Sequence, residues 1–160
     1  MNSNDLLDKP TAIVWPTILE AQSSVDASIN ATKGAEEMLL KAAYENNSAA
    51  VKLALAGGVD PNCWDSNGLT PLHIAAARGH HLLVDMLQGQ GAMVDSRAFG
   101  GFTPLHMAAF SGSPECTLLL LDGTADPNPK DTYGLTPLKV ATQLQHEKVV
   151  SLLKSRGGHD

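Results

Sequence analysis

The chain has 160 residues, of which 43% are hydrophobic and 18% charged, and its formal net charge is -6. This is the composition of a folded domain, and because the basic residues form no cluster and the apolar runs are short, neither nucleic acid nor a membrane is expected as a partner. Two cysteines are too few for a disulfide framework and the N-terminus has no basic or apolar leader, so we expect an intracellular protein, in the cytoplasm or the nucleus.

Residues 1–34 form the first predicted unit, an N-terminal extension. Thr17 and Glu20 have the spacing of a capping box, which indicates a short helix over about 18–29. One side of this helix would carry five residues at helical spacing: Ile18, Ala21, Gln22, Val25 and Ile29. Two interpretations remain open. The extension is either a flexible leader with a nascent helix, or a segment that docks on the unit that follows, on a partner, or in a groove of its own chain.

A 33-residue repeat follows the extension. The triplet Thr-Pro-Leu begins at Thr70, at Thr103 and at Thr136. One period before Thr70, the segment 38–43 keeps the Leu and Ala-Ala positions but lacks the Thr-Pro and His residues. The sequence therefore predicts one repeat domain over 35–160, with units at about 35–66, 67–99, 100–132 and 133–157.

The repeated motif carries a family resemblance. Residues 68–75 read Gly-Leu-Thr-Pro-Leu-His-Ile-Ala, and residues 101–108 read Gly-Phe-Thr-Pro-Leu-His-Met-Ala. This element and its period resemble the ankyrin repeat family over residues 35–157. The resemblance implies an all-α solenoid of stacked helix-turn-helix units joined by β-hairpin loops, with a concave face that binds partner proteins.

The residue types within each unit agree with that fold. The three repeated Thr residues are suited to cap a helix, and the Pro after each suits the first helical position. Gly79 and Gly112 are expected to end the first helices, because glycine tolerates the left-handed conformation. An apolar second helix follows in each unit.

The end units are expected to be adapted to water. In the last unit, Lys139, Thr142 and Gln145 replace the His, Ala and Gly of the inner units. In the first unit, Glu36 and Lys41 fall where a preceding repeat would pack. The sequence therefore predicts a complete stack of four units.

Candidate catalytic and metal-binding residues are few. His73 and His106 recur at the repeat period, but the resemblance implies that such a His binds loop backbone, and Lys139 interrupts the series. Cys116 lies on an apolar helix face and is expected in the core. No nucleophile elbow, phosphate loop or zinc-hydrolase motif occurs. We therefore predict no cofactor, no metal and no enzymatic activity.

The predicted recognition surface follows from the aromatic residues. Five of the seven fall on positions that vary between repeats, which the resemblance places on the concave face. We predict an apolar groove centred on Phe102, Phe110 and Tyr133, with Arg78, Arg97 and Lys130 at its rim. The alternative is that some rings fold back onto the hairpins. The predicted partner-binding residues are Tyr44, Leu69, Ala77, Arg78, Phe99, Phe102, Phe110, Ser111, Tyr133, Leu135 and Leu144.

The predicted function is that of a non-catalytic protein-protein interaction module, acting as an adaptor, an inhibitor or an assembly factor and monomeric until it binds. The size resembles that of the ankyrin-type inhibitors of cyclin-dependent kinases, which is one alternative. A second alternative is a substrate of an asparagine hydroxylase, because Asn128 with Leu120 eight residues before it matches the context of that modification.

Overall fold

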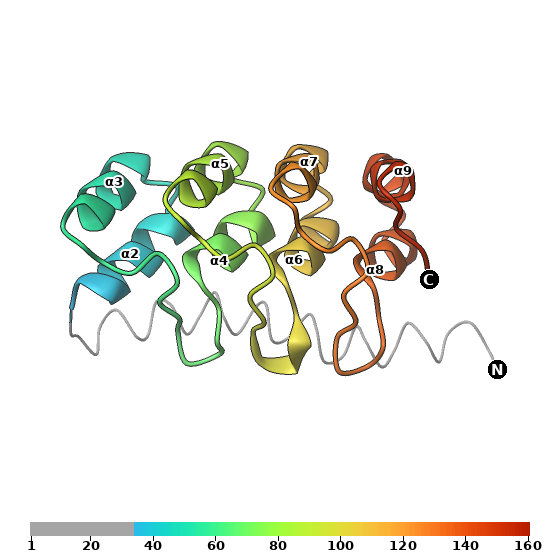
Figure 1. Cartoon of the computed structure of the whole chain (residues 1–160), viewed down its shortest axis with the longest axis horizontal. Helices are drawn as coiled ribbons and strands as arrows, with labels where there is room; N and C mark the ends of the chain where they lie inside the picture. Colours follow the sequence, from blue (N-terminus) through green and yellow to red (C-terminus); the bar gives the residue numbers. More distant parts are fainter. Residues whose placement is uncertain (1–33) are drawn as a thin grey trace.

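Two layers of helices make up residues 34–160, the part of the chain that the computed structural model describes. Each repeat gives one helix to each layer (Figure 1). The first helices are α2 (Ala35–Tyr44), α4 (Pro71–Ala77), α6 (Pro104–Ser111) and α8 (Pro137–Gln143). The second helices are α3 (Ser48–Ala56), α5 (His81–Gly89), α7 (Pro114–Asp122) and α9 (Glu147–Ser155). The predicted all-α solenoid is confirmed, while the predictions for residues 1–33 lie outside the described residues.

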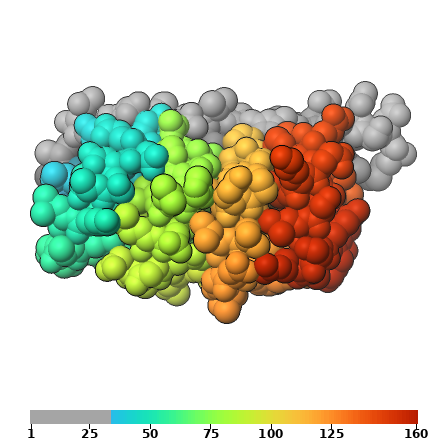
Figure 2. Space-filling model, turned by 90° about the horizontal axis from the view of Figure 1, so that it is seen from above, coloured from blue at the N-terminus to red at the C-terminus, as the bar shows by residue number. Residues whose placement is uncertain are grey.

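Neighbouring repeats pack side by side along the stack. Helix α4 packs on α2 and α6, and α6 packs on α8. In the layer formed by the second helices, the outer layer, α7 packs between α5 and α9. Figure 2, which looks onto this outer layer, shows the repeats as successive bands from teal to red.

The predicted helix starts are confirmed. Thr70 Oγ1 accepts the backbone N–H of His73 at 3.4 Å, and Thr136 Oγ1 accepts that of Lys139 at 3.2 Å. Pro71 occupies the first helical position, where its missing N–H breaks no bond. In the two inner repeats the His ring completes a reciprocal cap, because its Nδ1 accepts the backbone N–H of the capping Thr at 3.2 Å.

The same His rings join each inner repeat to the next one. His73 Nε2 donates to the carbonyl oxygen of Phe102 at 2.9 Å, and His106 Nε2 donates to that of Leu135 at 3.0 Å. Nδ1 accepts and Nε2 donates, so each ring is neutral and its tautomer is set by the fold. The backbone-binding role that the resemblance implied for these residues is confirmed.

The turns between paired helices need a left-handed residue. Gly79 and Gly112 supply it with φ of 71° and 68°, as predicted. At the same position the end repeats carry Asn46 at 56° and Gln145 at 60°. A side chain is strained in this region, so the two end turns are less favourable than the inner ones.

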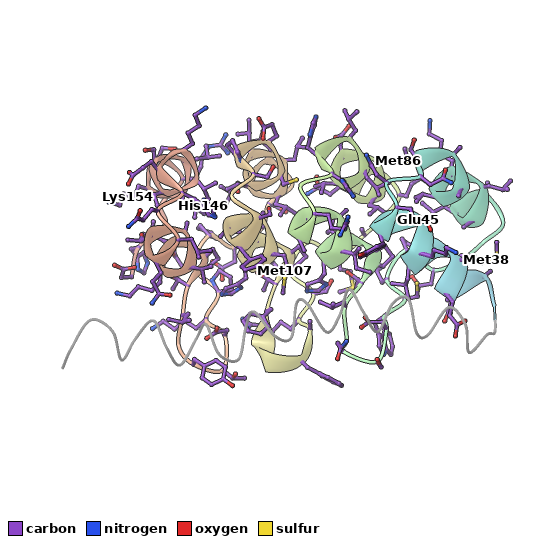
Figure 3. The ribbon with its side chains drawn as sticks, turned by 180° about the vertical axis from the view of Figure 1, so that it is seen from behind. Met38, Glu45, Met86, Met107, His146 and Lys154 are labelled. Carbon is purple, nitrogen blue, oxygen red and sulfur yellow. The ribbon has the colours of Figure 1, made fainter. Side chains whose placement is uncertain are left out.

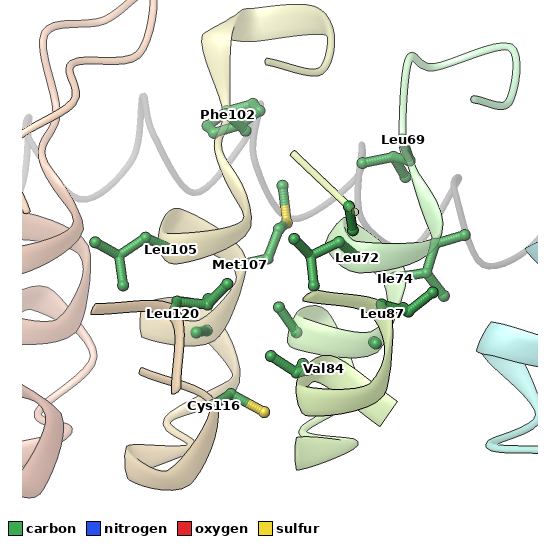
Figure 4. Packing of buried hydrophobic residues seen from close by; sticks show 14 of the residues in the cluster. Leu69, Leu72, Ile74, Val84, Leu87, Phe102, Leu105, Met107, Cys116 and Leu120 are labelled. Carbon is green, nitrogen blue, oxygen red and sulfur yellow. The ribbon is translucent and has the colours of Figure 1, made fainter. Parts of the chain in front are cut away.

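Small and branched residues share the core. Ala75, Ala76, Ala108 and Ala109 are fully buried, which lets α4 and α6 approach closely. Figure 4 shows Leu105 on one side of α6 and Met107 on the side that faces α4. The inner first helices α4 and α6 thus contribute buried side chains to the interfaces with both neighbouring repeats, so neither inner repeat completes its core alone.

The connecting loops turn back on themselves as hairpins. The carbonyl of Phe102 accepts the N–H of Ala98 at 2.9 Å, and the other two hairpins make the corresponding bond. Adjacent hairpins are joined as well, since Phe99 N donates to Asn67 O at 3.0 Å and Thr132 N to Gly100 O at 2.9 Å. No residue within 34–160 is in a strand, so these loops are hairpin turns without strands.

The two ends of the stack differ. At the C-terminal end Thr142 and Lys154 face water, as predicted. At the N-terminal end the prediction of a polar face is wrong, because Met38 is 70% exposed and Leu53 is 76% exposed. Lys41 is instead paired along its own helix with Glu45, at 3.7 Å.

Candidate partner-binding surface

One row of predicted residues lies at the C-terminal ends of the first helices. Tyr44, Ala77 and Phe110 occupy the same repeat position, and all three are half-buried. The guanidinium of Arg78 lies 4.1 Å from the centre of the Tyr44 ring, a cation-π contact that ties the first repeat to the second. Ser111 Oγ donates to Ala76 O at 2.9 Å, so this hydroxyl is engaged within the stack.

Three predicted partner-binding residues are buried, and their predicted exposure is wrong. Leu69 is 7% exposed, Phe102 3% and Leu135 6%. Each follows the glycine at which its hairpin turns back, and its side chain lies beneath the hairpin. Phe102 also meets the His106 ring edge-on, with 6.0 Å between ring centres. The groove centred on Phe102 therefore does not form, and for this ring the alternative is correct.

The hairpins expose other large apolar side chains. Phe99 is 68% exposed and Tyr133 is 47% exposed, as predicted. Trp64 at 70% and Met93 at 63% were not among the predicted partner-binding residues. The sequence offers one signal for Met93, because Asp60 and Asp126 hold its position in the neighbouring repeats.

Three of these side chains meet at one cleft. Trp64, Met93 and Phe99 line a hollow of about 480 Å³ between the first and second hairpins. Its other lining residues are Asp60, Asn62, Gly68, Thr70, Ser96 and Arg97. None of the helix-end residues such as Tyr44 or Phe110 lines it. The described residues therefore offer two separate apolar surfaces, a helix-end row and a hairpin cleft.

The second hairpin differs from its neighbours, which explains why it presents Phe99. Asp65 Oδ1 accepts the N–H groups of Asn67 and Leu69 at 2.8 and 2.9 Å, and Asp131 makes the same pair of bonds in the third hairpin. Ala98 stands at this position in the second hairpin and cannot do so. A 3₁₀ turn, η1 (Phe99–Gly101), replaces the aspartate cap, with φ of 82° at Gly100.

Arg97, one of the predicted rim residues, is hydrogen-bonded within the fold. Arg97 Nη1 donates to Lys130 O at 2.8 Å and to Gly101 O at 3.3 Å. This side chain joins the second hairpin to the third while it lines the cleft. Arg97 therefore supplies positive charge at a fixed place beside Phe99.

The periodic histidines lack the chemistry of a metal site. Burial lowers the pKa of His73 to about 4 and also lowers the pKa of His106. Both ring nitrogens of each are already bonded within the protein. Among residues 34–160 no three His, Cys, Asp or Glu side chains are grouped as metal ligands.

The two cysteines are free thiols in the core. Burial raises the pKa of Cys63 to about 12 and also raises the pKa of Cys116. A thiol is nucleophilic only as the thiolate, so neither is activated at neutral pH. The predicted core position of Cys116 is confirmed.

Asn128 holds a loop in place. Its Nδ2 donates to Gly157 O at 3.0 Å and its Oδ1 accepts the N–H of His159 at 2.8 Å. Asn62, at the same position two repeats earlier, makes the corresponding bonds to Gly91 and Met93. The Asn128 side chain is therefore held by the C-terminal loop in the folded chain.

The comparisons with known proteins agree with this geometry. The family model described as ankyrin repeats in three copies matches residues 39–131 and 94–160. The chain belongs to the ankyrin repeat family. Ankyrin repeats are generally modules for protein-protein interaction, and among residues 34–160 no helix is long and apolar enough to cross a membrane.

One relative is a putative ankyrin repeat-containing protein of Treponema pallidum, strain Nichols. It is 41% identical to this chain over 54 residues, which are 34% of this chain and 18% of the relative. The similarity therefore concerns the ankyrin repeats and a small part of that protein.

Proposed function

We propose that this ankyrin protein is a non-catalytic module that binds another protein through its hairpin cleft, with the helix-end row as a second contact. The observation that carries the proposal is the exposure of Trp64, Met93 and Phe99 around one hollow. Aromatic residues and Met are enriched where proteins bind each other. Grouped exposed apolar side chains mark a contact surface more strongly than single ones.

The partner surface that fits this cleft is apolar at its centre. A side chain of the partner would enter between Trp64 and Phe99, whose rings are both largely exposed. Arg97 and Asp60 at the margin offer one charge of each sign, so polar groups of the partner set its orientation more than its affinity. Binding would occupy the partner's surface, which is how an adaptor, an inhibitor or an assembly factor acts.

The test is affinity capture from cell extract with the unchanged chain and with a Trp64→Ser/Phe99→Ser double variant, read by mass spectrometry. The purified captured protein is then titrated against both. We expect the double variant to bind roughly 30-fold more weakly or worse, the loss expected when at least one of the two side chains is an interface hot spot.

The matched control is Leu82→Ser. Leu82 is 74% exposed on α5 and does not line the cleft. It should retain the same proteins as the unchanged chain. If the double variant also retains them with unchanged affinity, while remaining folded by circular dichroism, the hairpin cleft is not the binding surface.

A further inference from the structure

The N-terminal face of the first repeat is an apolar surface apart from the hairpin cleft. Met38 of α2 and Leu53 of α3 are both more than two-thirds exposed there. They line a hollow of about 260 Å³ together with Ala35, Ala50, Ala54, Gly57 and Val59. None of these lining residues is charged. In Figure 3, Met38 lies at one end of the stack and Lys154 at the other.

In the later repeats, the positions that correspond to Met38 and Leu53 are covered by the preceding repeat. Pro71, Pro104 and Pro137 hold the position of Met38 and are buried. Met86 holds the position of Leu53, is half-buried, and faces Lys52, Leu55 and Ala56 of the preceding repeat. The first repeat therefore presents a surface shaped to be covered by a preceding element.

The opposite end of the stack has no such requirement. There Lys139, Thr142 and Lys154 hold the positions that His106, Ala109 and Leu121 hold one repeat earlier. A terminal unit of a solenoid needs a polar outer face to be stable in water. The C-terminal unit has one and the N-terminal unit has Met38 and Leu53 instead.

We propose that residues 17–29 of this chain form a helix that covers the N-terminal face and caps the stack. The sequence of this segment has a capping box at Thr17 and Glu20, and an apolar side that includes Ile18, Val25 and Ile29. An apolar helix side on an apolar face removes both from water. This proposal stands independently of the hairpin cleft.

The connection favours this occupant over a separate molecule. The chain reaches the described structure at Gly34, directly before Ala35, which itself lines the hollow. Gly34 has φ of 118°, so the chain can leave the axis of α2 at that point. Five residues, 30–34, then span at most about 17 Å. So short a tether holds the segment near the face at an effective concentration on the order of millimolar.

The test is hydrogen exchange of the full chain, followed by mass spectrometry of peptides from residues 17–29. We expect their amides to exchange roughly tenfold or more slowly than an unstructured peptide. A Met38→Asp/Leu53→Asp double variant should return them to near the unstructured rate, because the charges make the face unfit for an apolar helix. Leu82→Asp, a change at an equally exposed leucine, should leave the slow exchange intact.

Three results would overturn the proposal. In the first, residues 17–29 exchange at the unstructured rate in the unchanged chain. In the second, they stay slow in the Met38→Asp/Leu53→Asp variant, which places the segment elsewhere. In the third, light scattering shows a dimer that this variant dissociates, with slow exchange confined to α2 and α3, which makes a second copy the occupant. Because Trp64 and Phe99 are unchanged in these variants, failure here leaves the proposed binding function standing.

Discussion

The inner and the end repeats of this stack follow the same plan but use different residues at two positions. The His that caps the first helix in both inner repeats is Leu40 in the first repeat and Lys139 in the last. The glycine between paired helices becomes Asn46 and Gln145. Only the two inner repeats thus carry the His that bonds the following hairpin, and both end repeats lack it.

In the inner repeats, the His of the repeated Thr-Pro-Leu-His motif couples one repeat to the next. A His ring is useful where a following hairpin supplies a carbonyl oxygen, as Phe102 does for His73. Gly112 is needed because a Cβ there would lie 2.7 Å from the ring of His146 in the next repeat. Gln145, at the same position of the last repeat, is exposed, so its side chain has room there.

The largest expected effect is at Phe102, whose ring fills the base of the inner hairpin. Replacement by Ala should lower the free energy of unfolding by about 3–5 kcal/mol, since a buried ring is lost and a cavity remains. Leu135→Ala, the same position in the last repeat, should cost less because fewer atoms are removed. Urea denaturation measures both.

Phe99→Ala is the control for this comparison. Its ring is largely exposed, so the change should stay within about 0.5 kcal/mol. Equal losses for Phe102→Ala and Phe99→Ala would contradict the burial of Phe102.

A smaller effect is expected from acidification, and it distinguishes the inner repeats from the ends. Below pH 6.5 the unfolded chain protonates His73, whereas burial lowers the pKa of the folded ring to about 4. Stability should therefore be complete above pH 6.5 and fall as the pH drops toward 4. His73 alone should account for roughly 2 kcal/mol between pH 7 and pH 5, measured by urea denaturation at both pH values.

His81→Gln is the control for the pH experiment, because His81 is exposed on α5. His73→Leu, which copies Leu40 of the first repeat, should reduce the pH dependence by more than this control does. Identical stability of the unchanged chain at pH 7 and pH 5 would show that neither buried ring resists protonation.

The smallest effect concerns the helix turns. Gln145→Gly should raise the free energy of unfolding by about 0.5–1 kcal/mol, because glycine adopts a φ of 60° without strain. Gly112→Ala should lower it by more, since it adds strain and a contact with His146. Thermal unfolding measures the stability of both variants. A loss of stability in Gln145→Gly would mean that the Gln145 side chain has a stabilising role.

Most of the fold could be predicted because its determinants are local. A Thr followed by Pro both caps and starts a helix. The glycine at the end of that helix, Gly79 or Gly112, allows the left-handed turn that follows. These features act within a few residues, so the helices of each repeat can be predicted from the sequence of that repeat alone. The register of the stack then follows from the period of 33 residues.

The surface was predictable only in part, because exposure depends on contacts between repeats. The burial of Phe102 rests on Gly100, where a Cβ would lie 2.6 Å from the ring. The hairpin cleft joins Trp64 to Met93, which meet only because adjacent hairpins are bonded side by side. Neither contact could be predicted from residues that are close together in the sequence.

The hydrogen bond from each His ring to the following hairpin also gives the stack an order of assembly during synthesis. His73 finds its acceptor 29 residues further along the chain, and His106 does the same. A growing polypeptide that ends within the second repeat therefore holds an imidazole N–H without its acceptor, and burying it unpaired is costly. Each inner repeat is completed only when the next hairpin has left the ribosome, so translation proceeds one repeat ahead of the finished structure.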